Sequence, residues 1–161
     1  MGSGKSSVGE KLAHRLGYEF VDTDVLVEER AGKSVKEIFG QDGEEAFRRL
    51  ESEIIAEVSK REGLVISCGG GAILNRKNME LLKQKAKIVY LRGDPALLYE
   101  RVKSSGETPL LEVEEPRQEF ERLFGQRKER YEESADIVVE VGEREQAEIV
   151  EEIVHLLGGA Q

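Results

Sequence analysis

The first seven residues combine glycines, a lysine and serines in a way that suits phosphate binding. Gly4, Lys5 and Ser6 match the end of the pattern G-x-x-x-x-G-K-[ST], in which backbone N–H groups and the lysine hold phosphates while the hydroxyl holds Mg²⁺. The first glycine of that pattern would lie upstream of Met1. A bare Gly-Lys-Ser triplet also occurs in flexible turns, so the residues that follow must discriminate between the two interpretations.

The segment after this loop has the spacing of an amphipathic helix. Val8, Leu12, Ala13 and Leu16 fall on one face, and Gly17 follows in the position of a C-terminal cap. A glycine-rich loop that runs into a helix N-terminus presents N–H groups and the positive end of the helix dipole to an anion. This arrangement favours a phosphate loop over a flexible turn.

Two aspartates lie where the first predicted strand, residues 18–22, ends. Asp22 and Asp24 flank Thr23 at the edge of a parallel sheet where ligands bind, so one carboxylate can face a metal and the other a substrate hydroxyl. The alternative is an Asx turn or an N-cap for a helix that starts near Val25. The local sequence supports the two interpretations equally.

Three glycines and two arginines complete the candidate chemistry. Gly69, Gly70 and Gly71 follow the predicted strand 64–68, and backbone without side chains lets another group approach closely. Arginines on helices are commonly solvated or paired with a glutamate four residues away. Arg48 and Arg127 become informative as a pair, because two guanidinium groups on opposite walls of a pocket can clamp a carboxylate.

Composition limits the class of protein. The chain has 161 residues, 39% of them hydrophobic, with a formal charge of −9, which argues against nucleic acid as a partner. No apolar run is long enough to cross a membrane, no signal segment opens the chain, and Cys68 is the only cysteine. We therefore expect a soluble, cytoplasmic monomer with a packed rather than a reactive Cys68.

Short β-branched runs alternate with longer helical patterns along the chain. This alternation predicts one α/β domain over residues 1–161, with three α/β/α layers and a twisted parallel sheet. Asp94 before Pro95 and Asn75 before Arg76 are expected N-caps. The polar break at 104–117 is either a surface connection or, in a phosphate-loop protein, a lid. Strands are expected at 18–22, 64–68, 88–91 and 137–141, and further helices at 24–32, 34–40, 43–62, 75–85, 94–104, 116–134 and 144–157.

The order and spacing of these motifs resemble shikimate kinase, a small member of the nucleoside monophosphate kinase group of phosphate-loop folds. The resemblance covers essentially the whole chain. It implies transfer of the γ-phosphoryl group of ATP to the 3-hydroxyl of shikimate, a step of chorismate and aromatic amino-acid synthesis. The matching segments are 2–6, 20–24, 38–39, 43–44, 47–51, 66–71, 89–91 and 109–111, together with Arg127 and Tyr131.

The same resemblance implies roles for individual residues. Lys5 and Asp24 would be catalytic, Lys5 on the transferring phosphate and Asp24 on the acceptor hydroxyl. Mg²⁺ would be held by Ser6 and Asp22, and a shikimate-binding helical segment would span about residues 25–62. The implied nucleotide site comprises Gly2, Ser3, Gly4, Lys5, Ser6, Ser7 and Arg101. The implied shikimate site comprises Asp24, Arg48, Gly69, Gly70, Gly71 and Arg127.

One position departs from the family pattern. Thr108 stands before Pro109 where the family usually has arginine, and loss of a comparable transition-state cation costs on the order of 10³-fold in rate. Arg101, Lys103 or Arg117 could substitute. The alternatives are another small-molecule kinase, such as a gluconate kinase or nucleoside monophosphate kinase, or a weakly active nucleotide-binding relative.

The expected sheet also lacks one strand. In the usual order of this fold, the strand that ends at the phosphate loop lies at the centre of the sheet, and none precedes Met1 here. A natural protein that begins about ten residues earlier, with an apolar strand running into a glycine, would supply it. The alternative is a rearranged sheet in which the flanking strands close the gap.

Overall fold

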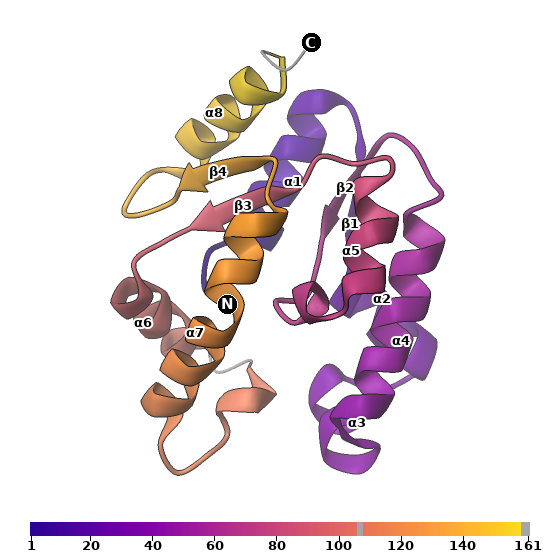
Figure 1. Cartoon of the computed structure of the whole chain (residues 1–161), viewed down its shortest axis with the longest axis vertical. Coiled ribbons are helices and arrows are strands. Elements are labelled where there is room, and N and C mark those ends of the chain that lie inside the picture. The colour runs from indigo at the N-terminus through magenta and orange to yellow at the C-terminus, as the bar shows by residue number, and fades with distance from the viewer. Residues whose placement is uncertain (106–107, 159–161) are drawn as a thin grey trace.

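The computed structural model describes residues 1–105 and 108–158 as an alternation of strands and helices (Figure 1). The strands are β1 (Glu19–Asp22), β2 (Leu64–Ser67), β3 (Val89–Arg92) and β4 (Ile137–Glu140). The helices are α1 (Lys5–Leu16), α2 (Thr23–Ala31), α3 (Val35–Gln41), α4 (Gly43–Val58), α5 (Arg76–Lys83), α6 (Pro95–Ser105), α7 (Pro116–Ser134) and α8 (Gln146–Gly158). Two short 3₁₀ turns, η1 (Ala72–Leu74) and η2 (Pro109–Leu111), complete the fold.

The predicted elements are all present, with shifted ends. The first helix begins at Lys5 rather than near Val8, because Gly4 has a φ of 80° and the helix starts directly after it. The helix expected over 43–62 ends at Val58, because the chain turns back to start β2 beside β1. The strands differ from expectation by one residue at an end.

Several expected caps are confirmed by their hydrogen bonds. Asn75 accepts from the N–H of Lys77 at the start of α5, and Asp94 accepts from the N–H groups of Ala96 and Leu97 at the start of α6. Gly17 ends α1 in the left-handed conformation, with a φ of 69°. These local signals set where each helix begins or ends.

The strands pair in two separate parallel sheets, as expected for a parallel sheet that lacks the strand ending at the phosphate loop. β1 pairs in parallel with β2, and β3 pairs in parallel with β4. In the described part of the chain β2 and β3 are not paired, so these flanking strands do not close the gap. Figure 1 shows the two strand pairs lying apart, with α1 between them.

Side chains of alternating strand residues build cores on both faces. On one face, α1 and α8 pack against β3 and β4 around Val139 and Ile153, both fully buried, and Val65 of β2 joins them. On the other face, Leu64 and Ile66 pack against α4, in a cluster that includes Val27. The strands are therefore covered by helices on both sides, as the three-layer prediction requires.

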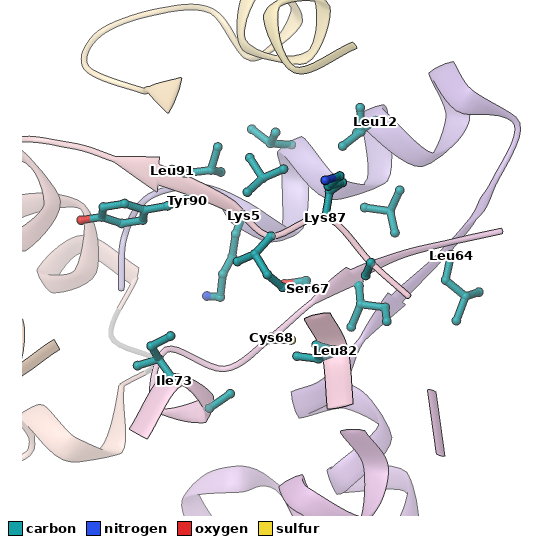
Figure 2. Close-up of a pocket in the computed structure, with 18 of the residues that line it drawn as sticks. Lys5, Leu12, Leu64, Ser67, Cys68, Ile73, Leu82, Lys87, Tyr90 and Leu91 are labelled. Carbon is teal, nitrogen blue, oxygen red and sulfur yellow. The ribbon is translucent and has the colours of Figure 1, made fainter. Parts of the chain in front are cut away.

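An apolar groove separates β2 from β3. The cavity has a volume of about 680 Å³, and Figure 2 shows Leu12, Leu64, Leu82 and Leu91 among the residues around it. Parallel strands at the centre of a sheet pair on both edges, whereas here the facing edges of β2 and β3 are unpaired within the described residues. Besides these strands, the lining includes Val8, Leu12 and Leu16 of α1 and Met79 and Leu82 of α5.

The segment predicted as a lid is described in part. Residues 106–107 lie outside the described residues, Ser104 and Ser105 end α6, and η2 follows. Lys36 of α3 forms an ion pair with Glu112 at 2.7 Å. This pair joins the end of η2 to the helices of the segment 25–62.

We predict that an apolar strand placed in the groove stabilises the fold. An N-terminal extension with about five β-branched residues ahead of Met1 would pair with both free edges. Burying a Val or Ile side chain contributes about 1.5–3 kcal/mol, and 1 kcal/mol corresponds to about 2–4 °C in a chain of this size. The melting temperature should rise by at least about 6 °C.

The matched control is a Gly/Ser extension of equal length, which supplies backbone but no apolar side chains. Both proteins are compared by thermal unfolding with the 161-residue chain. Equal melting temperatures for the two extensions would contradict the expected burial in the groove.

Candidate active site

The loop before α1 has the backbone of an anion site. Gly2 and Gly4 have φ values of 69° and 80°, which side-chain-bearing residues rarely adopt. A Cβ at Gly2 would lie 2.5 Å from the carbonyl oxygen of Leu98, so α6 also requires glycine there. Ser3 and Lys5 line the central cavity, and Ser7 lies in the exposed first turn of α1. The free N–H groups of that turn are available to an anion.

Ser6 and Asp22 meet at the carboxyl end of β1. The Ser6 hydroxyl donates to Asp22 Oδ2 at 2.8 Å, and Ser67 lies 3.4 Å from the same hydroxyl. Asp22 Oδ1 accepts from the N–H of Asp24 and caps α2. Both interpretations of Asp22 are therefore compatible, because one carboxylate oxygen caps the helix while the other faces Ser6.

This oxygen pair is suited to Mg²⁺. Magnesium is commonly bound by one or two protein oxygens, together with water and substrate phosphates. Among the described residues there is no group of three or more His, Cys, Asp or Glu side chains that could hold a metal alone. Ser6 and Asp22 therefore fit a magnesium ion that also takes phosphate oxygens.

Asp24 presents a free carboxylate oxygen inside the site. Within residues 1–105 and 108–158, Asp24 Oδ1 is buried without a hydrogen-bond partner. Burial raises the pKa of this carboxyl, Asp22 adds to the shift, and Lys5 and Arg48 oppose it. A carboxylate with a raised pKa is a better proton acceptor than a solvated one.

The glycine loop, residues 69–71, lies against the charged side chains. A Cβ at position 69 would lie 2.7 Å from Glu51 Oε1 and 2.8 Å from Asp24 Oδ1. A Cβ at position 71 would overlap the guanidinium group of Arg48. Side chains at positions 69 and 71 would displace the charged groups, so both of these glycines follow from the contacts.

Arg48 is held on α4 by two carboxylates. It forms ion pairs with Glu44 at 3.1 Å and Glu51 at 2.9 Å, and its guanidinium lies 5.1 Å from the ring centroid of Phe47. The Glu51 side chain is 1% exposed, and burial raises the pKa of its carboxyl. The expectation of helical pairing is thus correct for Arg48, yet its guanidinium also faces the glycine loop.

Arg127 reaches the glycine loop from α7. It is 2% exposed, and its Nε has no hydrogen-bond partner within the described residues. Its Nη1 would lie 3.4 Å from a Cβ at Gly70. Arg48 and Arg127 therefore approach neighbouring glycines of one loop, as the clamp hypothesis requires.

Two of the three cations considered for the lid, Arg101 and Arg117, have other partners. Arg101 donates to the Gly142 carbonyl at 2.6 Å. Arg117 donates to Glu121 and lies 6.0 Å from the ring centroid of Tyr99. Lys103 is exposed near the end of α6, and Thr108 precedes η2. Arg101 and Arg117 would have to leave these contacts to replace an arginine at position 108.

Met1 lies inside the site. It packs against α6 and α7, and its nitrogen would lie 3.7 Å from a Cβ at Gly70.

Comparison with known proteins assigns the family. The family model for shikimate kinase matches residues 1–158. The shikimate kinase of Actinobacillus pleuropneumoniae serotype 5b is 38% identical over 161 residues, which cover 100% of this chain and 93% of that protein. The chain belongs to the shikimate kinase family. This family consists of kinases that transfer phosphate to shikimate.

Solved structures of shikimate kinases have the same fold. The Acinetobacter baumannii enzyme in complex with shikimate superposes with a TM-score of 0.96 at 35% identity, covering 100% of this chain and 90% of that one. The Aquifex aeolicus shikimate kinase has a TM-score of 0.87 at 38% identity, covering 99% and 93% of the two chains. A gluconokinase from Sinorhizobium meliloti has a TM-score of 0.58 at 21% identity, covering 99% and 88%, which shows a shared fold alone.

The sequence analysis missed side chains that support those of the shikimate kinase site. Thr23 is fully buried and accepts from the N–H of Gly69 at 3.2 Å, and Glu51 holds Arg48. A signal for Glu51 exists in the pattern of α4, because it occupies a buried position between Phe47 and Ile54.

Cys68 behaves as expected, since burial raises the pKa of its thiol to about 12. No helix of the described residues is long and apolar enough to span a bilayer.

Proposed function

We propose that this shikimate kinase site binds shikimate between α4, α7 and the glycine loop, and phosphorylates its 3-hydroxyl with ATP. The observation that carries the proposal is the approach of Arg48 and Arg127 to neighbouring glycines of one loop, beside the free Asp24 Oδ1. Two guanidinium groups suit a carboxylate, and a free carboxylate oxygen suits a hydroxyl. Shikimate carries both groups.

In this proposal the substrate acid lies between the two arginines. Arg127 is buried with its Nε free among the described residues, so a bound carboxylate would supply hydrogen bonds that the protein does not. The glycine loop allows the ring of the substrate to approach the backbone of Gly69, Gly70 and Gly71. A nucleotide base has no carboxylate to place between the arginines, which disfavours a nucleoside monophosphate as the acceptor.

Asp24 is proposed to hold the acceptor hydroxyl and to take its proton as the oxygen attacks the γ-phosphoryl group. Its raised pKa makes it a better base, and its free oxygen can accept a hydrogen bond from a hydroxyl. In a loose transition state the protein acts mainly by positioning the groups and neutralising their charge.

Lys5 and the loop before α1 are proposed to hold the phosphates of ATP. Residues Gly2, Ser3 and Gly4 shape the loop, and Ser7 adds a hydroxyl in the first turn of α1. Ser6 and Asp22 would hold Mg²⁺, which neutralises phosphate charge when bound. Their observed hydrogen bond supports this pairing.

The adenine side of the site is proposed to involve Arg101. Its contact with Gly142 holds the guanidinium beside the loop between β4 and α8. The segment 104–117 is proposed as the lid and the segment 25–62 as the shikimate-binding part of a single domain. We further propose that the enzyme acts in the cytoplasm. We also propose that it is a monomer, because the candidate site is built from one chain.

We predict that Arg48→Ala and Arg127→Ala each raise the KM for shikimate by about 10- to 100-fold, because a hydrogen bond to a charged group contributes about 1.5–3 kcal/mol. The KM for ATP should change less than about 2-fold, since neither arginine contacts the nucleotide in this proposal. Steady-state kinetics with each substrate varied separately gives both constants.

Arg49→Ala is the matched control for Arg48, because Arg49 is the next residue of α4 and is exposed. Removing Arg48 also leaves Glu51 buried without its cation, so Arg48→Lys is added to retain the charge. Equal losses for shikimate and ATP, in variants with unchanged melting temperature, would reject the proposed clamp.

We predict that Thr108→Arg increases turnover, because it adds a cation beside η2, where the Pro-Leu-Leu segment of the lid is intact. An increase of about 10-fold in kcat is expected if no other cation already serves. Thr108→Gln, which is long but uncharged, is the control. No gain in the arginine variant would indicate that another side chain already neutralises the transferring phosphate.

A further inference from the structure

Tyr131 connects three elements around the glycine loop. It lies one turn after Arg127 on α7, so the two side chains share a face of the helix. Its hydroxyl donates to the carbonyl oxygen of Gly70. Its ring stacks on Tyr90 of β3, with centroids 5.1 Å apart and an interplanar angle of 25°.

Two side chains of α7 lie against the middle residue of the glycine loop. A Cβ at Gly70 would lie 3.3 Å from the Tyr131 hydroxyl and 3.4 Å from Arg127 Nη1. The neighbouring parts of the loop are held differently, since the N–H of Gly69 donates to Thr23 and the N–H of Leu74 donates to the Gly71 carbonyl. Tyr131 therefore holds the carbonyl group of the glycine that Arg127 also approaches.

We propose that Tyr131 is a positioning residue that fixes the glycine loop relative to Arg127 and so sets the width of the carboxylate site. The inference rests on the proposed function of Arg127 as a shikimate ligand. Tyr131 itself touches the loop and Tyr90, and its effect on the substrate is transmitted through Gly70 and Arg127.

Two features of the site make this hydrogen bond consequential. β2 and β3 are not paired to each other in the described residues, so no sheet hydrogen bonds hold the loop after β2 against β3. Tyr131 bridges that gap, because its ring packs on β3 while its hydroxyl holds the loop that follows β2. Burial raises the pKa of Tyr131, so the hydroxyl keeps its proton and donates throughout the neutral range.

The test is Tyr131→Phe, which retains the ring stack and removes the hydroxyl. The Kd and KM for shikimate should rise about 3- to 10-fold, while the KM for ATP stays within about 2-fold, as expected for one lost hydrogen bond. Tyr90→Phe is the matched control from the same stack, since the Tyr90 hydroxyl is buried without a partner among the described residues. Tyr90→Phe should leave the Kd and KM for shikimate and the KM for ATP unchanged.

A double-mutant cycle separates positioning from general stability. In an Arg127→Ala background, Tyr131→Phe should have little further effect on shikimate affinity, because the residue it positions is gone. Equal additional losses with and without Arg127, or equal losses of shikimate and ATP affinity in Tyr131→Phe, would overturn the inference. If Arg127→Ala itself leaves shikimate affinity unchanged, the proposed role of Arg127 fails instead.

Discussion

The close approach of charged side chains to a backbone without side chains is the constraint on which this site depends. Asp24 and Glu51 lie against Gly69, the Arg127 and Tyr131 side chains against Gly70, and Arg48 against Gly71. Helices α2, α4 and α7 can meet at one loop only because that loop occupies so little space. Because these glycines have no side chains, charged groups that are far apart in the sequence can approach the loop and face one substrate.

Bringing these charges together has an energetic cost that the protein offsets locally. A buried carboxylate is costly unless it is paired, and Glu51 is paired with Arg48 at 2.9 Å. Arg127 is buried without an ion pair among the described residues, and its nearest loop carries no side chain. Such incomplete pairing is typical of sites that complete their hydrogen bonds with a ligand.

The division of the sheet decides how the site is supported. β3 and β4 pack in the cluster around Val139 and Ile153, which Val65 of β2 also joins, and an apolar groove lies between β2 and β3. Helix α1 contacts β1, β2 and α8, and the Tyr90–Tyr131 stack brings α7 to β3. The two sides of the site are therefore held together mainly by helix packing and side-chain contacts, rather than by a continuous ladder of strand hydrogen bonds.

The sequence alone determined the features that depend on neighbouring residues: strand and helix types, the caps at Asn75 and Asp94, the turn at Gly4 and the set of chemical groups. Only the tertiary structure decided the pairing of Glu51 with Arg48 and the burial of Arg127. Local conformation follows from short-range hydrogen bonds and backbone preferences, which spacing reveals. The burial and partner of a charged side chain depend on elements that lie far away in the sequence, and these become neighbours only when the helices pack around the glycine loop.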